Sequence, residues 1–445
     1  MNSNSTQEGK AASPILTVAE AYGAFHRQTP AGAAWLGAKR DQAVRVFEAN
    51  GLPDTRSEDW KYTSLREFAA RSAKYLSEGS HPVAAAIISK QLEKLDLPAG
   101  EPVAVFANGL FNQNASSIDM KTGAAIHAFQ QLDADVQASV FDQLGAFATV
   151  ERYPMAALNT AFLADGLLVD VPAGTEVKQS MHVVFLTDGQ PVSTQPRLLV
   201  RAGANSSATL IEYHIGTGAG LCNAIAEIHC GSGSTFNYTK LQNTSNEAFH
   251  LAAQHAVLEK DSCFNAVHID TGGQLARNDL NVRLTGSGAH AALFGLFLAS
   301  DQQHVDNHTL LDHQAEATTS EEIYRGLVSG GGTAVFNGRI VVHPGADKTD
   351  AQLSNHNLLL SPSAEVNTKP ELEIYADDVK CSHGSTTGQL DENSLHYLQT
   401  RGIPADEARR MLVGAFTDEI TRRIENNQLQ GLIENLVTSS MEAMR

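Results

Sequence analysis

The sequence predicts a mainly β fold: a parallel, right-handed β-helix core with a helical unit at each end. Phrases of turn followed by strand recur along the chain, beginning near Gly174, Gly203, Gly231, Lys260, Gly286, Asp312, Gly330 and Ser361. Most of them begin about 26 to 31 residues after the previous one, and a period of about 20–50 residues is typical of a solenoid. One step, from Asp312 to Gly330, is shorter.

The strand-like runs between these turns support the same fold class. Apolar and polar residues alternate in them, as in residues 208–215, and no helical pattern separates the runs. An ordinary β-sandwich is the alternative, since its strands also recur with turn signals. The length of the repetition and the rarity of tight hairpin turns favour the β-helix.

Four segments follow from these patterns, and a chain of 445 residues is long enough for two or three structural units. Residues 1–30 are polar at their start, lack the apolar core of a signal peptide, and are expected to form a disordered or weakly ordered tail. Residues 31–100 predict a helical N-terminal domain. Residues 101–390 predict the β-helix core, with a helical insert at 133–149, and residues 391–445 predict a C-terminal helical domain.

Helical spacing and end signals support the two terminal units. Apolar residues at helical spacing in 31–50 stop at Gly51, and Trp60 and Tyr62 are expected to anchor this unit by packing. Near the C-terminus, Asp391 is a plausible N-cap and Pro404 suits the first turn of the next helix. The C-terminal helices either cap the open end of the solenoid or dock a partner.

Composition restricts the classes of partner. Asp plus Glu number 50 against 32 Lys plus Arg, a net charge of −18, which argues against binding to nucleic acid or anionic membranes. The longest apolar run, 291–299, is too short to span a bilayer, which needs about 20 residues. Four dispersed cysteines without a secretion signal are expected to be free thiols. A cytoplasmic location is therefore expected.

Several motifs of catalysis and cofactor binding are missing. The chain contains no GxxxxGK[ST], GxGxxG, HExxH or GxSxG, so ATP hydrolysis and several other enzyme classes are not expected. It also contains no CxxC, which argues against a self-sufficient iron–sulfur site built from clustered thiolates.

Cys381 and His383 form the first candidate metal site. They are two residues apart in a strand-like run, so their side chains would share one face. A thiol and an imidazole are both ligands for soft or borderline metals. The alternative is that Cys381 is a small apolar filler. Cysteines 222, 230 and 263 also lie in strand-like runs, where they are expected to fill the core.

His304, His308 and His313 form a second histidine group, together with Asp306 and Asp312. They could hold a metal ion or form hydrogen-bonded ladders on a solenoid face. The ladder is favoured, because strand register decides which face each residue takes and the sequence leaves the register open.

Several sequence blocks resemble the SufB/SufD family of iron–sulfur cluster assembly proteins. The most specific is DDVKCSHGSTTGQLDENSLHYLQTRGI at 377–403. The other blocks that match in the same order are SEDWKYTSL at 57–65, ALNTAFLADG at 157–166, HVDNHT at 304–309, AVFNGRIVV at 334–342 and NLLLSPSAEVNTKPELEIYADDV at 357–379. The resemblance begins at about Trp35. No cysteine precedes Cys222, whereas SufB usually carries an N-terminal cysteine cluster, so the resemblance is to the SufD branch.

The resemblance implies a non-enzymatic scaffold subunit that pairs with SufB through the end of the β-helix and binds the ATPase SufC through its C-terminal helices. Cys381 and His383 match the family motif and become candidate ligands for iron or a cluster at the SufB interface. Met411, Phe416 and Ile420 become candidate contacts with SufC. No cofactor is expected in the isolated chain, and a transient iron–sulfur cluster is expected in the complex. A homodimer is possible when the chain is alone, and the sequence leaves the choice between homodimer and heterodimer open.

Two other functions remain open from the residues. One is a β-helix enzyme acting on polysaccharide, such as a lyase, although such enzymes usually act outside the cytoplasm. The other is a structural adaptor without metal contact, in which Cys381 and His383 only pack.

Overall fold

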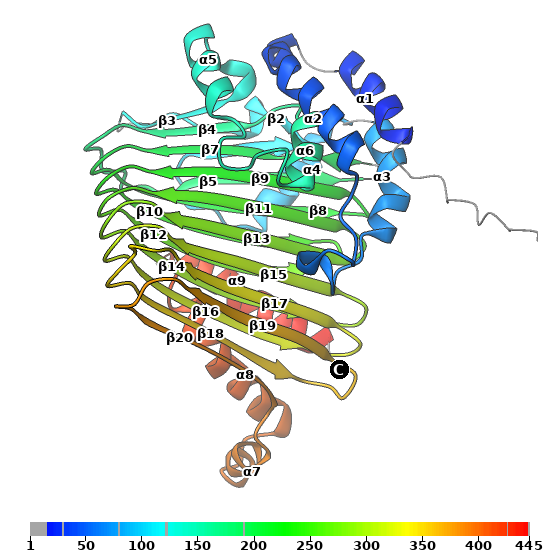
Figure 1. Ribbon diagram of the computed structural model, residues 1–445. Helices are drawn as coiled ribbons and strands as arrows, with labels where there is room; N and C mark the ends of the chain where they lie inside the picture. The colour runs from blue at the N-terminus through cyan, green and yellow to red at the C-terminus, as the bar shows by residue number, and fades with distance from the viewer. Residues whose placement is uncertain are drawn as a thin grey trace, which may run out of the picture.

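A β-solenoid forms the body of the molecule (Figure 1). The computed structural model describes residues 16–28, 31–78, 81–120, 123–189, 192–424 and 426–443. Two 10-stranded sheets face each other. Sheet A has the order β2-β1-β5-β8-β10-β12-β14-β16-β18-β20, and sheet B runs from β19 through β17, β15, β13, β11, β9, β7 and β4 to β3, with β6 beside β9. The predicted parallel β-helix is confirmed.

The strands of sheet A are β1 (Val103–Ala107), β2 (Leu110–Phe111), β5 (Met181–Asp188), β8 (Ser207–Thr217), β10 (Thr235–Thr244), β12 (Cys263–Gly272), β14 (His290–Ala299), β16 (Thr319–Val328), β18 (Asp350–Leu359) and β20 (Lys380–Gln389). Those of sheet B are β3 (Ala125–Ala128), β4 (Leu167–Val171), β6 (Ser193–Thr194), β7 (Arg197–Ala202), β9 (Leu221–Cys230), β11 (Phe249–Leu258), β13 (Leu275–Leu284), β15 (His304–His313), β17 (Thr333–Val342) and β19 (Glu365–Ile374).

Strand register explains the sequence period and its one short step. Thr235 pairs with Cys263 in parallel register, and Cys263 pairs with His290, so one coil corresponds to one repeat. The turn phrases up to Asp312 all lead into strands of sheet A, whereas those at Gly330 and Ser361 lead into β17 and β19 of sheet B. The short step therefore marks a change from one sheet to the other within a coil.

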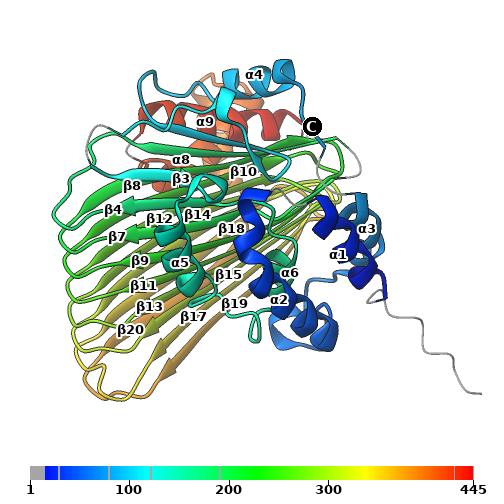
Figure 2. The same cartoon turned by 90° about the horizontal axis from the view of Figure 1, so that it is seen from above.

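Helices cover the outer faces of both sheets (Figures 1 and 2). Helices α1 (Leu16–Gln28), α2 (Gly37–Asn50), α3 (Arg66–Glu78), α5 (Ala134–Gln143) and α6 (Pro154–Ala161) lie on the side of sheet B. Helices α4 (Ala85–Glu93), α8 (Ala405–Thr421) and α9 (Asn427–Ala443) lie on sheet A, and α7 (Glu392–Thr400) extends beyond β20. Short 3-10 helices occur at Ala31–Leu36, Glu58–Trp60, Gln113–Ala115 and Phe129–Gln131.

Helix α1 lies in the segment that the sequence predicts to be a weakly ordered tail. Its Ala21 is fully buried, and the rings of Tyr22 and Phe25 lie 6.1 and 5.4 Å from the ring of Phe162. These contacts join residues far apart in the chain. Local sequence pattern does not reveal them, and residues 1–15 lie outside the described part.

The segment around Trp60 fastens the N-terminal helices to sheet B. Trp60 is buried and the guanidinium of Arg277 lies 3.8 Å from the centre of its ring, while Tyr62 is 44 % exposed. Arg277 donates to Asp306 at 2.7 Å, and the Thr63 hydroxyl donates to the same carboxylate at 2.5 Å. Of the two predicted aromatic anchors, only Trp60 packs in this way.

Candidate functional site

The C-terminal end of the solenoid is open. Strands β19 and β20 are the last strands of their sheets, and each pairs with a neighbour on one side only (Figure 1). All residues from Ser382 to Gln389 are exposed. Unpaired backbone N–H and C=O groups along an exposed edge strand form a template for pairing with another chain.

Cys381 and His383 share one face of β20. They pair in register with Ala351 and Leu353 of β18, whose side chains are buried in the solenoid interior. Because ladder partners in parallel strands point to the same side, both residues face the end of the solenoid core. Cys381 is half-buried and His383 is exposed. Burial raises the pKa of the Cys381 thiol, although a backbone hydrogen bond from Ala351 lowers it.

This pair alone provides two metal ligands. Within the described residues, neither belongs to a group of three or more His, Cys, Asp or Glu side chains placed to hold one ion. An iron–sulfur cluster is held by four ligands in most proteins. A cluster at this end would therefore need further ligands from a second chain.

Exposed large apolar side chains gather near the same end. In the described part of the chain they are Tyr62, Ile374, Tyr375, Tyr397 and Met411, and only Tyr62 lies elsewhere. Ile374 ends β19 and Tyr375 follows it, whereas Tyr397 and Met411 lie on α7 and α8. Apolar groups gathered on an exposed surface are typical of protein interaction sites.

The three predicted SufC contacts on α8 lie in different environments. Met411 is 48 % exposed, whereas Ile420 is fully buried in the apolar layer between α8 and sheet A. Phe416 is partly buried, with the guanidinium of Arg325 5.1 Å from its ring centre, and Arg325 also pairs with Glu419. Helix α8 thus packs on the outer face of sheet A and leaves the open end uncovered, unlike the capping arrangement considered from the sequence.

The structure keeps His304 and His308 of the second histidine group beside Asp306 and separates His313 from them. His304 and His308 lie on the outer face of sheet B, where His304 Nε2 is 2.9 Å from the Thr63 hydroxyl and His308 Nε2 is 2.9 Å from Asp306. His313 faces the interior, within hydrogen-bond distance of the hydroxyls of Thr318 and Ser320. Their roles are hydrogen bonding and ion pairing, as the ladder interpretation favours.

The four cysteines are free thiols. Cys222 and Cys230 are buried, Cys263 is half-buried, and burial raises the pKa of all three thiols, that of Cys222 to about 12. Cys222 lies beside His214 and His250, a grouping that sequence reasoning missed. The signal is the repeat itself, because Cys222 and His250 are one coil apart and pair in register.

Two family models cover most of the chain. The SufBD protein N-terminal region matches residues 26–183, and the SufBD core domain of the SUF system for FeS cluster assembly matches residues 185–416. The chain belongs to the SufBD family. The matched core domain includes Cys381, His383 and Met411.

Curated relatives agree with this membership. A SufBD family iron–sulfur cluster assembly protein of Synechocystis is 32 % identical over 417 residues, covering 90 % of each chain. The iron–sulfur cluster assembly protein SufD of Escherichia coli is 29 % identical, covering 87 % of this chain and 89 % of its own. A chloroplastic Arabidopsis protein, ABCI7, is 24 % identical over 95 % of this chain and 90 % of its own. The SufD branch predicted from the missing N-terminal cysteines is thus supported.

Within the described residues, none of the helices combines the length and the apolar character needed to cross a bilayer.

Proposed function

We propose that this SufBD family protein is a scaffold subunit for iron–sulfur cluster assembly that pairs with a SufB-type chain through the edges of β19 and β20. The single observation that carries the proposal is the open end of the solenoid, where both sheets stop at a strand that pairs on one side only. A second β-helix with a matching edge would continue both sheets and satisfy the unpaired backbone groups. The proposal places this assembly in the cytoplasm, which the composition favours.

The opposite end of the solenoid is less suited to such pairing. There sheet A ends in β2, which pairs with β1 in antiparallel fashion, and sheet B ends in β3, which pairs with β4 in the same way. Both edge strands are short, a common way to protect a sheet from further pairing. The proposal therefore places the partner at the end formed by β19 and β20.

Cys381 and His383 are proposed as ligands contributed by this chain to a cluster or iron ion held between the two subunits. They face the end of the core from the exposed strand, at the surface where the partner would pair. The partner would supply the remaining ligands. The isolated chain is then expected to hold little iron, alone or as a homodimer, and the complex to hold a transient cluster as cargo.

The ATPase partner, SufC, is proposed to bind the exposed side of the C-terminal helices. Met411 is the predicted contact that is most available, since Ile420 is buried against sheet A and Phe416 is held beneath Arg325. Tyr397 on α7 adds a second exposed apolar side chain to this region.

Family membership favours the scaffold over a polysaccharide-acting β-helix enzyme. The adaptor without metal contact differs from the scaffold only in the role of Cys381 and His383, so metal content in the complex distinguishes the two.

The test is His383→Ala in the complex with SufB- and SufC-type partners. Cluster content, measured as iron and acid-labile sulfide per complex, should fall while the three chains still co-purify, because the exposed His383 contributes little to folding. His396→Ala on α7, another exposed histidine, is the matched control and should leave cluster content unchanged. Unchanged iron and sulfide in an intact His383→Ala complex would remove His383 from the proposed ligands, and the same result for Cys381→Ala would favour the adaptor.

A further inference from the structure

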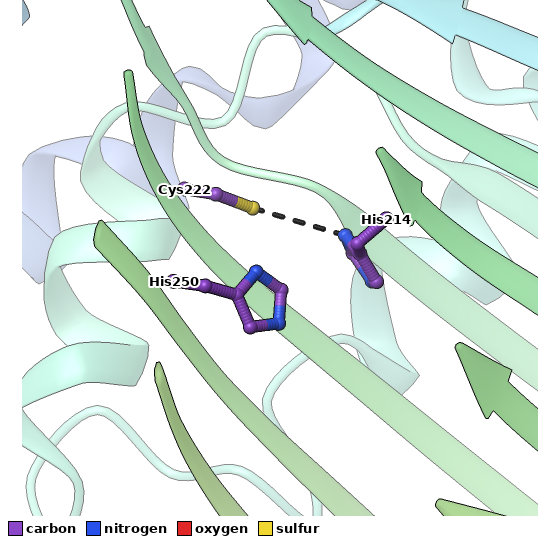
Figure 3. A group of neighbouring side chains, drawn as sticks. All are labelled: His214, Cys222 and His250. Carbon is purple, nitrogen blue, oxygen red and sulfur yellow. Dashed lines mark hydrogen bonds between the residues drawn. The ribbon is translucent and has the colours of Figure 1, made fainter. Parts of the chain in front are cut away.

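The interior of the solenoid contains a group of polar side chains that is separate from the site at the open end. Three of them come from different strands of one region: His214 from β8, Cys222 from β9 and His250 from β11 (Figure 3). All three are buried, at most 4 % exposed. One ligand atom from each lies within 4.8 Å of the other two, and Cys222 Sγ is 3.8 Å from His214 Nδ1.

A carboxylate orients His214 for this arrangement. Nε2 of His214 lies 2.5 Å from Oε1 of Glu212, and Glu212 also accepts a hydrogen bond from the Tyr238 hydroxyl. When Nε2 carries the proton and donates it to the carboxylate, Nδ1 is left with a lone pair directed at Cys222. A histidine that binds a metal through one nitrogen and donates its other N–H to a carboxylate is a recurrent feature of metal sites.

His250 provides an independent observation. Its ring is fully buried, yet neither Nδ1 nor Nε2 has a hydrogen-bond partner among the described residues. Its ring centre lies 4.6 Å from that of His214, and its Cα pairs in register with Cys222. Buried polar groups in native proteins almost always have a partner, and in His250 the unpartnered nitrogens lie beside a thiol and a second imidazole, where a bound ion would satisfy one of them.

Two buried carboxylates, Glu212 and Asp270, lie near the group together with one buried amine, Lys240, which is 3.5 Å from Asp270. Glu212 is within hydrogen-bond distance of His214. A carboxylate beside a ligating imidazole is compatible with a bound cation.

We propose that His214, Cys222 and His250 form an internal binding site for a borderline divalent transition metal ion of the Zn²⁺ or Fe²⁺ type. One thiolate and two imidazoles match the ligand preference of these ions and not that of Mg²⁺ or Ca²⁺, which prefer oxygen. Binding releases the thiol proton of Cys222 to solvent, as metal binding to a cysteine does in general. A fourth position is left for water or for the Thr194 hydroxyl, which is the ladder neighbour of Cys222.

Thr194 also lies beneath the helices that cover sheet B. It lines a small cavity of about 20 Å³ together with Phe162, Ser193 and Gln195. A volume of this size holds about one water molecule. Exchange of the ion after folding is therefore expected to be slow, and the metal should be present while the chain folds.

The experiment uses Co²⁺ as the probe, supplied in the growth medium of cells producing the full chain. The purified wild type should contain about one internal Co²⁺ per chain and show a thiolate-to-Co²⁺ charge-transfer band in the near ultraviolet. Cys381→Ala should retain the band, which separates this site from the open end. Cys230→Ala, which removes another buried cysteine of β9, should retain it as well.

Loss of the band is expected in Cys222→Ala and in His250→Ala. Glu212→Gln should weaken metal affinity by about 10–100-fold, measured by competition with a chelator, because it removes the carboxylate that orients His214. His268→Ala is the matched control for His250, since His268 is also fully buried without hydrogen-bond partners but has no thiol beside it. Circular dichroism checks that each variant is folded, and Cys222→Ser replaces Cys222→Ala where the alanine variant does not fold.

Three results would overturn the site: a folded wild type without bound Co²⁺, a band that persists in Cys222→Ala or Cys222→Ser, or a band that disappears in Cys381→Ala alone. None of these results bears on whether β20 pairs with a SufB-type chain, so this site and the proposed function are tested separately.

Discussion

The two ends of the solenoid differ in how their polar groups are satisfied. At the N-terminal end, Arg197 and Glu227 are buried and paired at 2.5 Å, and Glu227 also accepts backbone N–H groups from Gly145, Phe147 and Ala148. At the C-terminal end, β20 from Ser382 onward is exposed and its outer edge is unpaired.

The difference also appears along a single ladder. Glu322 of β16 pairs in register with Leu353 of β18, which pairs with His383 of β20. The side chain at this inward position is thus buried in β16 and β18 and exposed in β20. Changes in the covered coils should therefore alter stability, whereas changes at the open end should alter association.

The largest effect on stability is expected from Arg197→Met. Removing the guanidinium leaves Glu227 buried without its charged partner, which costs about 3–5 kcal/mol of unfolding free energy. Denaturant titration measures the loss. Arg422→Met removes the cation of an exposed pair with Asp418 on α8 and should cost less than about 0.5 kcal/mol. Equal losses in the two variants would contradict the contrast between covered and exposed regions.

The stability of the fold is expected to depend on pH through Glu322. Burial raises the pKa of Glu322 to about 8, and its one hydrogen bond, from the Thr309 hydroxyl at 2.6 Å, lowers it only in part. The folded state therefore prefers the protonated acid, while the unfolded state ionises near the ordinary value. The contribution of neutral Glu322 to the free energy of unfolding is fully present below about pH 4.5. It is lost as pH rises through about 8.

Glu322→Gln isolates this effect, because the amide stays neutral. Between pH 5 and pH 7 the wild type should lose on the order of 2–3 kcal/mol relative to the variant. The measurement is a pair of unfolding curves at each pH. A difference between the two proteins that does not change with pH would show that Glu322 titrates normally.

The smallest effect on stability is expected from Met411→Glu. Its side chain is exposed, so the change should cost within about 0.5 kcal/mol, yet capture of a SufC-type ATPase should be lost. Arg409→Glu, an exposed position on the opposite face of α8, is the control and should retain binding. A folded Met411→Glu protein that still captures the ATPase would remove Met411 from the proposed contact.

Much of the fold could be predicted from the sequence. The β-helix follows from the spacing of its turns, since each coil repeats the same strand and turn pattern. The docking of α1 could not, because it depends on contacts between Phe25 and Phe162. The position of the C-terminal helices could not either, because an amphipathic stripe fits the outer face of a sheet as well as its end.

The candidate sites, too, could be predicted from the sequence only in part. The shared face of Cys381 and His383 follows from their spacing in a strand, but their exposure depends on which coil is last. The approach of Cys222 to His250 follows from the repeat once the register is known. His214 belongs to the opposite sheet, and only the packing of the two sheets brings it to Cys222.

The most direct test of the open end is Thr387→Lys, measured by co-purification with a SufB-type partner. Thr387 is exposed and pairs in register with Asn357, on the inward side of the last coil. A lysine there should leave the chain folded and abolish pairing, because a charge pointing into the junction blocks the next coil. Ser382→Lys, on the outer side of the same strand, should pair normally. Normal pairing by a folded Thr387→Lys chain would contradict the account.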